Sequence, residues 1–472
     1  MPPLLFNQFD LAPWSPIAQV AAEDINLAEI SPLILAAVLL SLVVIYLASK
    51  LGGEICARVN LPPVLGELFG GVVVGVSVLH LLIFSEGAAV EPSVLTTFIQ
   101  QTAGMDPTIS GTVASTASEV ISVLSEIGVM ILLFEIGLES DLEGLLKVGP
   151  QAALVALVGV VAPFSAGTIG LITLFHVDLV PAIFAGAALT ATSIGITAKV
   201  LAEIQKLTSP EGQIIIGAAV LDDILGIIVL AVVASLAKTG TVEVSNVLYL
   251  IGSSVVFLVG SIVLGRFLSP FFLGMVSRLT TRGGLLIPSL VFAFVLGYIA
   301  VILGLEAILG AFTAGLVLGE TDKRRALEEQ IVPIADMLVP VFFVCVGAKT
   351  DISVLNPMVP ENREGLIIAS FLIVVAIVGK VVSGATVYSP PGINRWAIGI
   401  GMIPRGEVGL IFAAVGSASG ALSKSLEAGV IVMVILTTFV APPLLRVVFK
   451  TDEEAVDAPS LASEVAELPP DG

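Results

Sequence analysis

Apolar segments long enough to cross a membrane make up most of this chain, and they restrict its fold more than any other feature. A spanning α-helix needs about 20 mostly apolar residues. Of the 472 residues, 56% are hydrophobic and only 12% are charged, whereas soluble domains carry about 25% charged residues. The sequence therefore predicts an all-α polytopic membrane protein with 13 transmembrane helices, at residues 32–50, 63–84, 119–139, 151–175, 179–200, 212–237, 246–266, 286–303, 305–320, 331–348, 364–388, 396–418 and 426–447.

The distribution of basic residues tests this number of helices, because cytoplasmic loops are enriched in Lys and Arg. With thirteen spans the termini lie on opposite sides of the membrane. Fourteen of the 20 basic residues then fall on the C-terminal side and four on the other, while Lys380 and Arg405 lie inside spans. This bias predicts a cytoplasmic C-terminus and an external N-terminus. A prokaryotic inner membrane is the expected location, with an internal photosynthetic membrane as the alternative.

The membrane domain is expected to cover residues 32–447, between an external segment at 1–31 and an acidic tail at 448–472. The composition of the tail predicts disorder. Residues 85–118 are rich in Ser and Thr and are predicted to form an external loop. The net charge of −19 is spread over loops and tail, which argues against nucleic-acid binding.

Two segments of the first half of the chain resemble two segments of the second half. Residues 65–75 align without gaps on 309–319, with five identities in eleven positions, and residues 134–142 resemble 343–352. The members of each pair are offset by seven helices, an odd number, so the halves cross the membrane in opposite directions. The sequence therefore predicts inverted repeats at about 63–237 and 305–447, an architecture typical of secondary transporters with a site at the midplane.

The repeats also share an interrupted helix. The segment around Thr190, Thr192 and Ser193 corresponds to a segment containing Pro404-Arg405-Gly406-Glu407. Hydroxyl side chains compete for backbone hydrogen bonds, and proline breaks helices. Corresponding interruptions in two halves indicate a transporter site. The alternative for the hydroxyl groups alone is hydrogen bonding to their own helix.

Five charged residues lie at bilayer depth near this site: Asp222, Asp223, Lys380, Arg405 and Glu407. A charge at that depth needs a partner or an aqueous cavity. Asp222 and Asp223 point about 100° apart on a helix, so one can face Lys380 while the other faces a cavity. We predict that Asp223 is the ion ligand. Desolvation favours its protonated form, and the ionised form is a hard oxygen ligand, so a proton and a cation compete for one site.

Several other interpretations of these residues remain open. The Lys380–Asp222 pair could be purely structural, and Arg405 with Glu407 could pair together or offset the charges at half-helix ends. Weaker candidates for a direct role lie near helix ends or beside glycines: Glu67, Glu126, Glu135, Glu306 and Asp336. An intramembrane aspartyl protease is disfavoured because its two aspartates come from different helices. A cation channel is the more serious alternative.

The motifs resemble those of the monovalent cation:proton antiporter-2 family. The resemblance covers roughly residues 32–447 and rests on Thr190-Ala-Thr192-Ser193, Leu221-Asp222-Asp223, Gly379-Lys380 and Pro404-Arg405-Gly406-Glu407. It implies a core that moves like an elevator, a dimerisation domain and two crossed discontinuous helices. It also implies a homodimer in membrane lipid with a function in pH homeostasis.

The Asp-Asp pair with a lysine resembles the electrogenic sodium/proton branch of that family, which exchanges two protons for one sodium. By this resemblance Asp223 binds Na⁺, Asp222 pairs with Lys380, and Thr190 and Thr192 lie at the helix crossing. The chain is then not an enzyme and needs no cofactor, and its transported ions are Na⁺ and H⁺. Potassium-efflux relatives typically carry Gln-Asp where this chain has Asp-Asp, which favours Na⁺. Transport of K⁺ or Li⁺ stays open, since the same oxygens can bind other hard cations.

Overall fold

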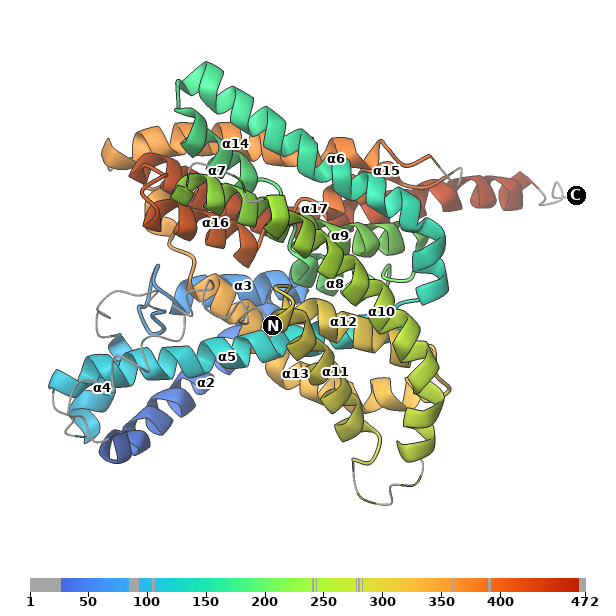
Figure 1. Cartoon of the computed structure of the whole chain (residues 1–472), viewed down its shortest axis with the longest axis horizontal. Helices are drawn as coiled ribbons and strands as arrows, with labels where there is room; N and C mark the ends of the chain where they lie inside the picture. The colour runs from blue at the N-terminus through green and yellow to red at the C-terminus, as the bar shows by residue number, and fades with distance from the viewer. Residues whose placement is uncertain are drawn as a thin grey trace, which may run out of the picture. The chain divides into compact units, whose positions relative to one another are not determined.

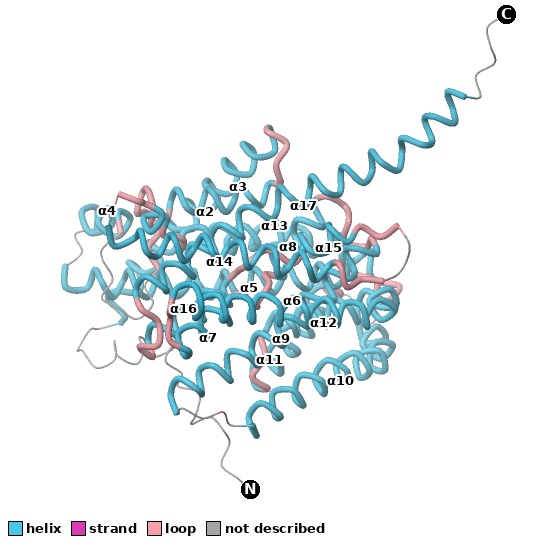
Figure 2. Tube along the Cα trace, turned by 90° about the horizontal axis from the view of Figure 1, so that it is seen from above, coloured by secondary structure: helices cyan, strands magenta, loops and turns pink. Residues whose placement is uncertain are grey.

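The computed structural model of the chain consists of α-helices joined by short loops (Figure 1). It describes residues 27–84, 93–103, 107–239, 242, 244–276, 278, 281, 283–358, 360–388 and 392–466. No β-strand occurs among these residues (Figure 2). The all-α class predicted from the sequence is therefore confirmed for the described part of the chain.

The helices follow one another along the described part of the chain. In order they are α2 (Leu27–Arg58), α3 (Pro63–Val74), α4 (Val94–Ala103), α5 (Pro107–Glu139), α6 (Leu142–Phe175), α7 (Leu179–Ala188), α8 (Ile194–Glu203), α9 (Pro210–Thr239), α10 (Val244–Val276), α11 (Leu286–Ile302), α12 (Ala307–Gly319), α13 (Arg324–Ala348), the 3₁₀-helix η3 (Ile352–Leu355), α14 (Pro360–Gly384), α15 (Arg395–Gly401), α16 (Glu407–Ala418) and α17 (Lys424–Ala466).

Within the described residues, eight helices are long and apolar enough to cross a membrane: α2, α5, α6, α9, α10, α13, α14 and α17. Five shorter apolar helices accompany them, corresponding to α3, α7, α11, α12 and most of α16. Each of the thirteen predicted spans overlaps one or two helices of the structure. The membrane class is thus confirmed, and the number of thirteen crossings remains a prediction.

The structure differs from the prediction at the segment expected to be an external loop, residues 85–118. This segment contains α4, and α5 begins at Pro107. The Ser and Thr residues do not end the helix, because their hydroxyls donate to carbonyls of the preceding turn. Ser115 Oγ, for example, donates to the carbonyl of Thr112 at 3.1 Å. Residues 85–92 and 104–106 lie outside the described residues.

A second difference concerns the acidic tail. α17 continues past the predicted end of the membrane domain at residue 447 and reaches Ala466. Glu and Ala are good helix formers, and both are frequent between residues 451 and 466. Residues 467–472 lie outside the described residues.

The chain divides into two compact units. The first unit comprises the described residues of Met1–Glu54, with Gly66–Ile127 and Pro340–Asp351. Inside it α3 approaches α13 closely at Gly71 and Gly347. A Cβ added at Gly71 would lie 2.9 Å from the Cα of Gly347 and still closer to the carbonyl oxygen of Val344. Only glycine permits backbones to approach this closely.

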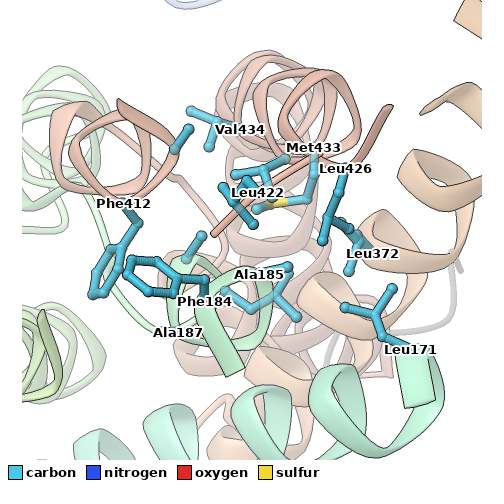
Figure 3. Packing of buried hydrophobic residues seen from close by; sticks show 14 of the residues in the cluster. Leu171, Phe184, Ala185, Ala187, Leu372, Phe412, Leu422, Leu426, Met433 and Val434 are labelled. Atoms are coloured by element: carbon cyan, nitrogen blue, oxygen red, sulfur yellow. The ribbon is translucent and has the colours of Figure 1, made fainter. Parts of the chain in front are cut away.

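The second unit comprises Ile55–Leu65, Gly128–Val339 and Ile352–Gly472. In it α14 packs against α6 and α17, and α6 packs against α9 (Figure 1). An apolar core lies among α6, α7, α14, α16 and α17 (Figure 3). Its members include Leu171, Phe184, Leu372, Phe412 and Met433. Two of the helices around this core, α14 and α16, carry Lys380 and Glu407, which the sequence predicted at bilayer depth.

A second glycine contact, within the second unit, joins α5 to α12. A Cβ added at Gly137 would lie 3.0 Å from the Cα of Gly315 and closer still to the carbonyl oxygen of Phe312. In the alignment of the two halves, Gly315 corresponds to Gly71 and Gly137 corresponds to Gly347. Corresponding residues therefore make the same contact, once in each unit.

Candidate functional site

Two helix interruptions form the centre of the candidate site. α7 ends at Ala188 and α8 begins at Ile194, while α15 ends at Gly401 and α16 begins at Glu407. The first interruption contains Thr192 and Ser193, whose hydroxyls compete with helical hydrogen bonds. The second contains Pro404, which lacks a backbone N–H. Both interruptions occur where the sequence predicted them.

Hydrogen bonds tie the two interruptions to each other. The backbone N–H of Ser193 donates to the carbonyl of Pro404 at 2.8 Å. Thr192 Oγ1 donates to the carbonyl of Met402 at 3.1 Å, and Thr197 Oγ1 donates to that of Gly401 at 2.9 Å. These contacts satisfy buried backbone groups that the broken helices would otherwise leave unpaired.

Arg405 adds a charge to this junction. Its side chain is completely buried, and Nη1 donates to the carbonyl of Ala191 at 2.9 Å. The carbonyl of Arg405 itself accepts from the hydroxyl of Thr438. Arg405 Nε and Nη2 have no acceptor among the described residues. A cation beside the carbonyls that follow α7 offsets the negative end of that half-helix. The side chain of Glu407 lies outside the described part of the structure, so its pairing with Arg405 stays a prediction.

The structure brings Lys380 of α14 together with Asp222 of α9. Lys380 Nζ lies 3.1 Å and 3.0 Å from the two carboxylate oxygens of Asp222, and both side chains are completely buried. Gly159 of α6 leaves room for the lysine, since a Cβ there would lie 3.3 Å from Nζ. The positive charge of Lys380 and the negative charge of Asp222 thus compensate each other inside the protein.

Asp223 faces a different environment from Asp222. It lines a cavity together with Thr192, Ser193, Ile194, Glu306, Ile308, Gly406 and Val408. The cavity measures about 10 Å³ for the centre of a water-sized sphere, which is close to the least that holds one water. It therefore admits a water or a cation that has lost most of its hydration shell.

The hydroxyl residues of the first interruption have different surroundings. Thr192 lies at the junction and lines the cavity. Thr190 is buried, and its hydroxyl donates to the carbonyl of Ala187 at 2.7 Å, in its own helix. Sequence reasoning gave Ser193 and Glu306 no specific function at Asp223, and both line its cavity. For Ser193, its position next to Thr192 at the interruption was the available signal.

These features define a class of protein. An all-helical membrane protein with buried carboxylates beside paired helix interruptions has the architecture of a secondary transporter. Comparison with known proteins gives the family: residues 30–451 match the family described as sodium/hydrogen exchanger, transmembrane. The chain belongs to this family, which confirms the resemblance inferred from its motifs.

Similar proteins include characterised antiporters. The chain is 66% identical over 452 residues to the high-affinity Na⁺/H⁺ antiporter NhaS3 of Synechocystis, covering 95% of this chain and 98% of that protein. It is 32% identical to the Na⁺/H⁺-K⁺ antiporter GerN of Bacillus cereus, covering 88% and 97%. Its fold is similar to that of the sodium/proton antiporter MjNhaP1 of Methanocaldococcus jannaschii, with a TM-score of 0.58, 18% identity, and coverage of 87% and 96%.

Proposed function

We propose that the chain exchanges Na⁺ for H⁺ across a membrane by alternating access, with the proton and the cation competing for the Asp223 carboxylate. The observation that carries this proposal is the different environment of the two neighbouring aspartates. Asp222 is held by Lys380, whereas Asp223 lines a cavity beside the helix interruptions. Exchange of this kind needs no cofactor, because one carboxylate binds either ion.

The coupling follows from the chemistry of that carboxylate. Protonation removes the charge that binds a cation, and a bound cation disfavours the proton. We assume that the site can switch from one side of the membrane to the other only when a proton or a cation is bound. A proton must then move in one direction for the cation to move in the other. Thr192 and Ser193 provide neutral oxygens beside the charged one, which suits a hard cation.

The site residues take separate functions in this proposal. Asp223 binds Na⁺ or H⁺, and Thr192 helps to form the site, with Thr190 supporting the interruption. Lys380 pairs with Asp222 and releases a second proton when the cation draws Asp222 away, so two protons exchange for one Na⁺ and the exchange is electrogenic. Arg405 and Glu407 stabilise the charges of the interrupted helices.

We further propose thirteen membrane crossings with inverted repeats at about 63–237 and 305–447 and with the two interrupted helices crossing. The equivalent contacts Gly71–Gly347 and Gly137–Gly315 support this repeat. By resemblance, the protein is a homodimer in lipid whose core moves like an elevator and which serves pH homeostasis. The bias of basic residues supports an external N-terminus and a cytoplasmic C-terminus in an inner or internal photosynthetic membrane.

The experiment is dissipation of an imposed pH gradient in everted vesicles on addition of Na⁺. Wild type is expected to respond, and Asp223→Asn to lose the response. Asp141→Asn is the matched control, because Asp141 caps α6 through a bond from the N–H of Glu143 at 3.0 Å and Asn caps equally well. An unchanged response in Asp223→Asn, or cation flux without proton counterflux, would contradict the proposal.

A K⁺/H⁺ antiporter is the second candidate, since the similar protein GerN is a Na⁺/H⁺-K⁺ antiporter. Adding K⁺ to the same vesicles distinguishes the two. A response to Na⁺ that exceeds the response to K⁺ at equal concentration supports the sodium assignment, and the reverse order overturns it.

A further inference from the structure

The cavity of Asp223 is lined by a second carboxylate, that of Glu306 at the start of α12. Asp223 lies in the middle of α9, so the two carboxylates reach the cavity from helices far apart in sequence. Glu306 is half-buried. The proposed exchange assigns it no function, although it lies beside the same small space as the proposed ion ligand.

The backbone at Glu306 places this residue directly before the first turn of α12. Glu306 occupies the N-cap of α12 in an extended conformation, with φ −75° and ψ 140°, and its side chain makes no capping hydrogen bond to that helix. The N-terminal end of a helix carries a partial positive charge, which favours an ionised carboxylate there. Glu306 thus lies at a helix end that attracts anionic groups.

Ser193 provides an independent indication that this cavity takes a ligand. Ser193 is only 6% exposed, and its hydroxyl oxygen has no hydrogen-bond partner among the described residues. A buried hydroxyl of this kind is normally satisfied. Gly406 packs directly against it, since a Cβ at Gly406 would lie 2.8 Å from Oγ. The cavity thus combines an unused hydroxyl oxygen with two carboxylates, a set of hard oxygen ligands that suits a small cation.

We propose that Glu306 is a second cation-binding carboxylate of the Asp223 cavity and sets the Na⁺ concentration at which exchange reaches half its maximal rate. This inference rests on the proposed function. Two carboxylates that face one cavity raise the local concentration of cations. Asp223 remains the group that exchanges the proton, so Glu306 affects the apparent KM for Na⁺ rather than the maximal rate.

The test measures the initial rate of Na⁺-dependent proton movement in proteoliposomes over a range of Na⁺ concentrations. Glu306→Gln keeps the size of the side chain and removes its charge. We expect its KM for Na⁺ to rise about tenfold with little change in maximal rate. Glu306→Asp keeps the charge and is expected to restore most of the affinity.

Glu320→Gln is the matched control, since Glu320 lies at the other end of the same helix and pairs with Arg266 at 2.6 Å, away from the cavity. Its KM is expected to equal that of wild type. A second readout separates charge from structure. Glu306→Asp provides this readout, because a KM near that of wild type in this variant shows that the charge rather than the shape of the side chain sets the affinity.

The outcomes separate this inference from the function on which it rests. An unchanged KM in Glu306→Gln, with Asp223→Asn inactive, overturns the inference and leaves sodium/proton exchange in place. Loss of maximal rate in both Glu306→Gln and Glu306→Asp also overturns it, because the residue would then be essential rather than tuning affinity. No Na⁺-dependent proton movement in wild type would instead contradict the proposed function itself.

Discussion

Removing one member of the Lys380–Asp222 pair is expected to destabilise the protein more than removing both. Each carboxylate oxygen of Asp222 lies within 3.1 Å of Lys380 Nζ, and both residues are completely buried. Breaking such a pair from one side leaves an uncompensated buried charge, which costs about 3–5 kcal/mol. Replacing both partners by well-packed hydrophobic residues of similar volume is often neutral or stabilising by about 1–4 kcal/mol.

A double-mutant cycle measures this difference. The variants are Lys380→Met, Asp222→Leu and the combination of the two, purified in one detergent and compared by the midpoint of thermal unfolding. Each single variant is expected to unfold at a clearly lower temperature than wild type, and the double variant to recover most of that loss. The non-additivity is the signature of a direct pair.

The surface pair Arg266–Glu320 provides the control for this cycle. Its atoms are 2.6 Å apart, yet the side chains are 44% and 27% exposed, so breaking it is worth about 1 kcal/mol or less. The reasoning is refuted if Lys380→Met is as stable as wild type. It is also refuted if the double variant loses the sum of the two single losses.

Two further predictions concern the helix contacts and the junction of the interruptions. Gly137→Ala and Gly315→Ala place a Cβ against a backbone carbonyl of the facing helix, and each should lower the free energy of unfolding by about 1–3 kcal/mol, measured by thermal unfolding. The control is Gly111→Ala, whose Cβ meets nothing within 4 Å. An equal loss of stability in the control would contradict the close contact. Arg405→Lys removes the planar guanidinium that donates to the carbonyl of Ala191. We therefore expect the backbone amide of Ser193, which donates to the carbonyl of Pro404, to exchange its hydrogen faster than in wild type, as measured by mass spectrometry. Equal protection of this amide in both proteins would argue against Arg405 as the group that stabilises the junction.

The sequence predicted those features that follow from a single physical constraint. A charge inside an apolar segment must find a partner or a cavity, and two adjacent helical positions cannot point the same way. These two statements were enough to separate the environments of Asp222 and Asp223. In the same way, Pro404 and the hydroxyl residues before Ile194 located the two interruptions, because each disturbs helical hydrogen bonding.

Features that depend on tertiary packing could not be predicted in this way. Glu306 was one acidic residue among several near helix ends, and nothing in its local sequence indicates which cavity it faces. The hydroxyl of Thr190 bonds within its own helix while that of Thr192 reaches the facing interruption, although both residues occur in one motif. The repeat of Gly71 and Gly315 was visible in the alignment, but their partners Gly347 and Gly137 follow only from the three-dimensional structure.

The hydrogen bonds that join the two interruptions have a consequence for ionic radius. Ser193 and Thr192 are tied to the backbone of residues 402–404, and Arg405 is tied back to Ala191. Segments connected in both directions cannot separate to fit a larger cation or close around a smaller one. If the cation binds beside this junction, as proposed, the site is stiff and would discriminate between alkali ions through the strain of a poor fit. Selectivity would then depend on the junction as a whole, including residues that never touch the ion.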